Sequence, residues 1–205
     1  VLGRLRCVIH YGADLAGGAI YVAQGNATVP TVVDLQSGTV ISNNIAAYGG
    51  GIYVAQDGSQ VTLDDARIQS NFAITQGGGI RLFGDSELLL SNSVISGNYT
   101  FDSYGAGLSI NDGQTWISGT YIAGNQAGAL VTGGANGGGI YQDGGQLIMT
   151  NAALMRNSGY SGGGLYVLNA TAALTNVRVI TNYASQNGGG ISVAGGDLTM
   201  RTDFD

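Results

Sequence analysis

The chain has 205 residues, of which 37 are glycine, one is proline and 10% are charged. All of its seven basic residues are Arg, and a net charge of −6 leaves no basic surface for nucleic acid or anionic lipid. Hydrophobic residues make up 44% of the chain, and no run of 18 apolar residues predicts a membrane-spanning helix. Glycine without a strict three-residue period excludes collagen and indicates a fold with many tight turns.

A glycine-rich box followed by an aliphatic residue recurs along the chain and defines a repeat. The aliphatic residues that end the boxes lie 32, 28, 28, 32, 25 and 26 residues apart. Glycines permit positive φ and close backbone packing where the chain turns. The boxes are Gly17–Ile20, Gly49–Ile52, Gly77–Ile80, Gly105–Leu108, Gly137–Ile140, Gly162–Leu165 and Gly188–Ile191.

Each repeat is expected to contain three short strands, as the second repeat illustrates. Strand one covers 52–54, strand two 61–63 and strand three 66–68, each alternating with period two. A propeller blade needs four strands and about 40 residues, whereas three strands fit a repeat of 25 to 32 residues. We therefore predict that residues 1–205 form one all-β domain, a right-handed parallel β-helix of about seven coils.

Strand three leads into a second repeated element, an aliphatic residue followed by two others and then Asn. Equivalent residues of stacked coils lie above one another, so these Asn side chains are expected to form a hydrogen-bonded ladder at a buried corner. The predicted structural ladder consists of Asn44, Asn71, Asn98, Asn125, Asn157 and Asn182.

Two outward-facing rows are candidate contact surfaces. Along strand two, Leu89, Trp116 and Ile148 fall on consecutive coils and predict an exposed apolar association patch, with Trp116 as its anchor. An extended turn at 126–136 predicts an edge loop, either a recognition element or tolerated decoration. Along strand one, a Tyr row is expected either to contact glycans or a neighbouring molecule, or to stabilise adjacent strands. It comprises Tyr21, Tyr53, Tyr141 and Tyr166.

Residues suited to catalysis or metal binding are sparse. Asp64-Asp65 is the only adjacent acidic pair, and a solvated turn explains it better than a pair of glycosidase carboxylates. His10 is the only histidine and Cys7 the only cysteine, so no second residue of either type completes a zinc site. We therefore predict no enzymatic activity, no metal and no cofactor.

The box Gly17-Gly18-Ala19-Ile20 and the aliphatic-x-x-Asn element resemble the repeats of polymorphic outer-membrane adhesins, the autotransporter passengers of chlamydia-like bacteria. The chain is also similar to secreted bacterial right-handed β-helix repeat proteins, from about residue 8 to 200. In the adhesins the second element usually begins with Phe, where this chain has Ile, Leu or Val. The resemblance implies surface display, adhesion or self-assembly.

Two functional hypotheses follow. The first is a secreted or cell-surface structural protein, a β-solenoid subunit of a fibre or an adhesin segment. The second is a pectin-lyase-like β-helix that binds or cleaves polysaccharide along the Tyr row. Residues 7–10 fit a third strand before the first box, and the chain stops at Phe204-Asp205, where another third strand would begin. We therefore expect either a segment of a longer array or subunits that stack head to tail as a homopolymer.

Overall fold

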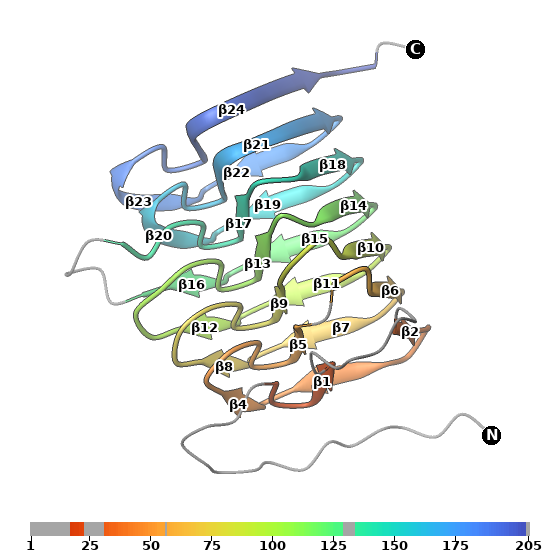
Figure 1. Ribbon diagram of the computed structural model, residues 1–205. Helices are drawn as coiled ribbons and strands as arrows, with labels where there is room; N and C mark the ends of the chain where they lie inside the picture. Colours follow the sequence, from red (N-terminus) through yellow and green to blue (C-terminus); the bar gives the residue numbers. More distant parts are fainter. Residues whose placement is uncertain (1–16, 23–30, 56, 129–133, 204–205) are drawn as a thin grey trace.

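The computed structural model describes residues 17–22, 31–55, 57–128 and 134–203. Within these ranges every strand is parallel to its neighbours, and the strands form three sheets without any helix. Successive coils stack in chain order, from the orange first coil to the blue last one (Figure 1). The predicted all-β parallel solenoid is confirmed.

The largest sheet has 12 strands and contains strands one and two of every coil. Strands one are β1 (Ile20–Val22), β5 (Ile52–Val54), β9 (Ile80–Leu82), β13 (Leu108–Asn111) and β17 (Ile140–Asp143). Strands two are β2 (Val32–Leu35), β6 (Gln60–Asp64), β10 (Glu87–Ser91), β14 (Gln114–Ser118) and β18 (Gln146–Thr150). In the last two coils both positions belong to one long strand, β21 (Leu165–Thr175) and β24 (Ile191–Arg201).

The pairing register of strand one follows the glycine boxes. Ile20 pairs with Ile52, Ile52 with Ile80, and the same alignment continues to Ile191 in the last coil. Because each box sets where its strand begins, repeats of unequal length still place equivalent side chains above one another. The predicted alignment of the boxes is therefore confirmed, and the differences in length fall in the turns.

Strand three forms a separate sheet of six strands. It contains β3 (Val40–Ser42), β7 (Arg67–Gln69), β11 (Val94–Ser96), β15 (Tyr121–Ala123), β19 (Ala153–Met155) and β22 (Arg178–Ile180). The described strands thus account for six turns, and β24 supplies strands one and two of a seventh.

A further short strand follows each ladder Asn and was not predicted from the sequence. These strands make the third sheet: β4 (Ile45–Ala46), β8 (Phe72–Ala73), β12 (Tyr99–Thr100), β16 (Gln126–Ala127), β20 (Ser158–Ser161) and β23 (Tyr183–Asn187). Four of the six contain only two residues, which is too short for a period-two pattern to be recognised in the sequence.

The interior of the coils is a continuous apolar core. In the second coil Ile52, Val54, Val61, Leu63 and Ile68 have no exposed surface, and their equivalents in the next coils are similarly buried. The alternate side chains of the same strands face outward. The core therefore holds the coils together, while the outward rows are available for function.

Candidate functional site

The six predicted Asn residues form a continuous ladder at one corner of the coil. At each step the main-chain N–H and Nδ2 of one Asn donate to Oδ1 of the Asn in the next coil, and both distances are 3.0 Å between Asn98 and Asn125. Nδ2 of Asn98 also donates to the carbonyl oxygen of Ile68 at 3.0 Å. The same pattern joins Asn44, Asn71, Asn98, Asn125, Asn157 and Asn182.

The hydrogen bonds of this ladder all run in one direction, because at every step the Asn of the earlier coil is the donor. At its first residue, Oδ1 of Asn44 is buried and has no hydrogen-bond partner. At its last residue, Nδ2 of Asn182 donates to the carbonyl oxygen of Leu154 at 2.8 Å, but its main-chain N–H has no acceptor among the described residues. The ladder therefore has an unused acceptor at one end and an unused donor at the other.

The outward row of strand one contains two pairs of stacked Tyr rings. Tyr21 and Tyr53 stack with ring centroids 5.4 Å apart, and Tyr141 and Tyr166 stack at 5.6 Å. Between the two pairs the row is interrupted. The register aligns Tyr21, Tyr53, Arg81, Ser109, Tyr141, Tyr166 and Ser192.

The expectation that Tyr141 lies on the surface is wrong, since only 5% of it is exposed. The Tyr104 ring covers it with a centroid distance of 4.6 Å. Tyr104 directly precedes a glycine box. Its counterpart Tyr48 also precedes a box, and the ring centroids of Tyr48 and Tyr53 are 5.7 Å apart. Neither residue was predicted from the sequence, although their shared position before a box is a usable signal.

Arg81 is a buried cation between the two Tyr pairs, with 7% of its surface exposed. Its guanidinium carbon lies 5.5 Å from the Tyr48 ring centroid and 5.6 Å from that of Phe83. Its Nη1 donates to Oγ of Ser109 at 3.2 Å, whereas its buried Nε has no partner. Burial lowers the pKa of Arg81, and nearby Tyr53 opposes this shift. Arg81 was not selected from the sequence.

Asp143 ends β17 beside this row, and its carboxylate is partly desolvated. Burial raises the pKa of Asp143 and the Asp112 carboxylate adds to the shift, while the hydrogen bond from the Tyr141 hydroxyl, at 3.4 Å, opposes it. A carboxyl whose pKa is higher in the folded than in the unfolded state costs stability when it is ionised. That cost is present at neutral pH and disappears below the unfolded pKa of about 3.9.

We therefore expect Asp143→Asn to raise the melting temperature at pH 7 and to leave it unchanged at pH 3. Thermal unfolding at the two pH values measures this, with Asp34→Asn on the exposed part of β2 as the control. An equal gain in stability at both pH values would contradict the assigned role of the Asp143 charge.

The predicted apolar patch on strand two is present as a cluster of neighbours. Leu89 pairs with Trp116 and Trp116 with Ile148, so the three side chains lie on adjacent coils of the same face. Each of them is partly rather than fully exposed. Their role in association stays a prediction.

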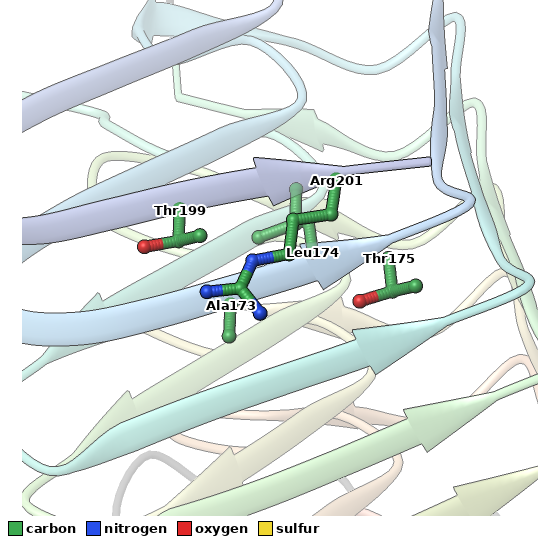
Figure 2. Close-up of a pocket in the computed structure, with 5 residues that line it drawn as sticks. All are labelled: Ala173, Leu174, Thr175, Thr199 and Arg201. Carbon is green, nitrogen blue, oxygen red and sulfur yellow. The ribbon is translucent and has the colours of Figure 1, made fainter. Parts of the chain in front are cut away.

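A shallow hollow of about 170 Å³ lies at the end of the same face, between β21 and β24. Figure 2 shows the Arg201 side chain reaching across β21 towards Ala173. The hollow offers one guanidinium and two hydroxyls, and no carboxylate lines it. Its lining residues are Ala173, Leu174, Thr175, Thr199 and Arg201.

The acidic pair Asp64-Asp65 is exposed: Asp64 ends β6, and Asp65 begins the bend that follows. Asp64 accepts a hydrogen bond from the Ser91 hydroxyl, and Asp65 accepts one from the Ser37 hydroxyl, each at 2.6 Å. Across the described part of the chain, no three His, Cys, Asp or Glu side chains gather in a way that would hold a metal ion. No helix there is long and apolar enough to cross a membrane.

Some of the selected residues fall outside the described ranges. Cys7 and His10 do, as does part of the predicted loop at 126–136, whose residues 129–133 are not described. At the end of this loop, the carbonyl oxygen of Ala135 accepts a hydrogen bond from the main-chain N–H of Tyr160 at 2.8 Å. The end of the loop is thus hydrogen-bonded to β20 of the following coil.

Comparison with known families agrees with this geometry. A family model described as a right-handed β-helix region matches residues 36–202. The chain belongs to this right-handed β-helix family. Comparisons of the β-helix with curated proteins and with solved structures found no match. Family membership establishes the fold, and the function has to be argued from the surfaces described above.

Proposed function

We propose that this β-helix is a non-enzymatic extracellular structural protein whose copies associate head to tail. The observation that carries the proposal is the one-directional Asn ladder, which a further coil in the same orientation can continue. β24 pairs with β21 alone, and β22 and β23 each lie at the edge of their sheets among the described residues. Unpaired strand edges of this kind are ready sites for pairing with another chain.

The last coil also exposes side chains that belong to a core. Val193 and Met200 are 41% and 52% exposed, although they lie in register with Val167 and Leu174, which are 0% and 1% exposed. A further parallel coil stacked on β24 would bury these side chains in the way that β24 buries the coil before it. Apolar area removed from water would drive this contact.

The Asn ladder indicates which surface of a second copy fits. Asn182 at the last coil has an unused donor, and Asn44 at the first coil has a buried, unused acceptor. A second copy in the same orientation would join these two groups and continue the ladder. Such a contact is heterologous and propagates into a filament.

The first coil is better covered than the last one. Its inward side chains Val22 and Ile41 are 7% and 5% exposed. Ile20, Val33 and Leu35 of the same coil are only partly buried, so this coil also keeps apolar surface that a second copy would cover. We expect filament growth to depend on concentration.

The resemblance to surface adhesins supports an extracellular location, with adhesion as a second role of the same rod. The partly exposed patch of Leu89, Trp116 and Ile148 is the candidate for side-by-side contact between rods. Polysaccharide binding along strand one is the second candidate function, and the aromatic rings that cover Arg81 favour it.

Met200→Asp should abolish head-to-tail growth, because it places a charge on the inward side of the open coil. The matched control is Thr199→Asp, which puts the same charge on the neighbouring, outward-facing position of β24. Negative-stain electron microscopy and light scattering across a concentration series measure the length of the particles.

We expect filaments from the wild-type chain and from T199D, and short rods from M200D. Circular dichroism checks that both variants keep the fold. Rods of constant length from the wild-type chain at every concentration would contradict head-to-tail association. Equal growth of M200D and T199D would show that the open coil is not the contact.

A further inference from the structure

We propose that two copies of this β-helix pair side by side in antiparallel orientation, each through the outward face of strand two. The two-fold axis of the pair runs parallel to the strands and passes over Trp116. This inference rests on the proposed self-association and adds the partner and the orientation of its lateral contact. It does not require the head-to-tail contact.

The apolar side chains of this face form a compact patch with polar or small neighbours on both sides. Leu89, Trp116 and Ile148 are partly exposed and lie on consecutive coils. Thr62 precedes them in the register, and Ala173 follows them. A two-fold axis at Trp116 places Leu89 opposite Ile148 of the partner subunit. Both copies therefore use the same patch, and its apolar area is removed from water.

Small side chains beside the patch let a second face approach closely. Ser91, Ser118 and Thr150 lie two positions further along the same strands and face the same side. They are shorter than the patch residues, so the apolar side chains are the first to meet a partner. Trp116 is the largest of these and lies in the centre, where the binding energy of an interface concentrates.

Charges of opposite sign lie two coils away from Trp116 on either side. Asp64 ends β6 on the outward face, two coils before Trp116. On the other side, the Arg201 side chain reaches across β21 towards Ala173, which lies two coils after Trp116 (Figure 2). Antiparallel pairing therefore brings Arg201 of the partner subunit over Asp64, once at each end of the contact.

The two charged groups also share one position along strand two. The register joins Asp64 to Arg201 through Ser91, Ser118, Thr150 and Thr175. An axis parallel to the strands preserves this position, so the carboxylate and the guanidinium meet without a shift along the strand.

Both groups are exposed and able to bind a partner. The Ser91 hydroxyl and the Asn92 amide both donate to Oδ1 of Asp64, at 2.6 and 3.4 Å, so the second carboxylate oxygen is available to a guanidinium. No carboxylate is among the residues that line the hollow under Arg201. Asp34 is exposed on the coil before Asp64 and adds a second negative charge beside the same contact.

The charges favour the antiparallel over the parallel arrangement. With the rods parallel, the two-fold axis runs along the stack, and each outward residue in the centre of strand two faces its own copy. The Asp34 carboxylates of the two subunits would then meet, and like charges that oppose one another weaken an interface. In the antiparallel pair Asp34 lies opposite Thr199 of the partner subunit, and no two carboxylates of strand two face each other.

The test is sedimentation velocity across a concentration series, in chains that also carry Met200→Asp. This substitution blocks the head-to-tail contact from the inward side of β24, so the particles report lateral pairing alone. The interface variant is Trp116→Ala. Its matched control is Tyr121→Ala, which removes a 49% exposed ring from β15 in a different sheet. Circular dichroism checks that each variant is folded.

Charge reversal tests the orientation. Asp64→Arg and Arg201→Asp each place two like charges together in the antiparallel pair, and the double variant D64R/R201D restores opposite charges. Both residues are exposed, so the substitutions carry little risk to folding. In a parallel pair residues 64 and 201 lie on distant coils, and the double variant would not recover.

We expect M200D and its Y121A derivative to form particles of twice the 20.8 kDa of one chain. The dissociation constant should rise at least about tenfold for W116A, because a central Trp is a typical hot spot. Each single charge reversal should raise it about tenfold, and the double variant should return to within about threefold of the parent, since the opposite charges face each other again.

Three results would overturn the proposal. The first is a chain that stays monomeric at every concentration. The second is equal pairing of W116A and Y121A, which would mean that the patch is not the contact. The third is a double variant that pairs no better than the single reversals, which would contradict the antiparallel orientation. Filament length enters none of these results, so failure of head-to-tail growth is judged separately.

Discussion

Replacing Asn125 with alanine should lower the free energy of unfolding by about 3–5 kcal/mol, since four buried groups each lose a hydrogen bond worth about 1 kcal/mol. Oδ1 of Asn125 accepts from the main-chain N–H and from Nδ2 of Asn98, both at 3.0 Å. Its Nδ2 donates to the carbonyl oxygen of Ile95 at 3.0 Å. The side chain is fully buried, so water cannot replace these bonds without opening the corner.

Urea denaturation followed by circular dichroism measures this loss. The control is Gln126→Ala, which removes a side-chain amide from the adjacent exposed residue and should change the unfolding free energy by less than about 0.5 kcal/mol. Asn125→Asp should also be strongly destabilising, because it keeps an acceptor for Asn98 but loses the donor to Ile95 and Asn157. A loss of under about 1 kcal/mol for N125A would mean that the ladder contributes little to stability.

Replacing Gly78 with alanine should be at least as severe, and we expect a loss of about 3 kcal/mol or more, or no folded protein. A Cβ atom there would lie 2.5 Å from the main-chain oxygen of Tyr99 and 2.7 Å from that of Ala106. Both neighbours are main-chain atoms, one in β12 and one in the next glycine box, and parallel pairing holds both, so neither can move away cheaply. Adding a methyl group therefore forces two coils apart.

The chain contains its own controls for this substitution. At Gly134 an added Cβ meets no atom of the described residues within 4 Å, so Gly134→Ala should be neutral or slightly stabilising. Ala106 occupies the position equivalent to Gly78 in another box, where it packs against Ala127 and Ala135 beside the longer coil. Thermal unfolding compares the variants. A G78A protein as stable as G134A would show that the close approach of main-chain atoms at Gly78 is not needed for the coils to stack.

The outward surface was only partly predictable from the sequence. The register of strand one follows from the boxes, so the alignment of Tyr21 with Tyr53 was predicted correctly. The burial of Tyr141 was not, because it depends on Tyr104, which reaches strand one from a turn that precedes a box. A period-two pattern predicts on which side of its strand a side chain lies. It does not predict which other residues cover that side chain.

Arg81 illustrates the same limit for the candidate site. In the sequence it is a single arginine in a row of Tyr and Ser residues, with nothing to distinguish it from an exposed charge. Its burial depends on Tyr48 and on Phe83, the residue after β9, whose rings both lie against the guanidinium. The unpaired Nε is a property of that assembled surface.

The solenoid, its register and its Asn ladder could be predicted from the sequence, since the boxes and Asn residues recur at intervals that only stacked coils explain. Stacking is a local contact that recurs between neighbouring coils, so every repeat contains the residues that make it. Which outward residues are covered became clear from the folded chain, where Tyr104 covers Tyr141 and Tyr48 lies against Arg81. These contacts arise where the repeats differ, and a repeat pattern does not encode such differences.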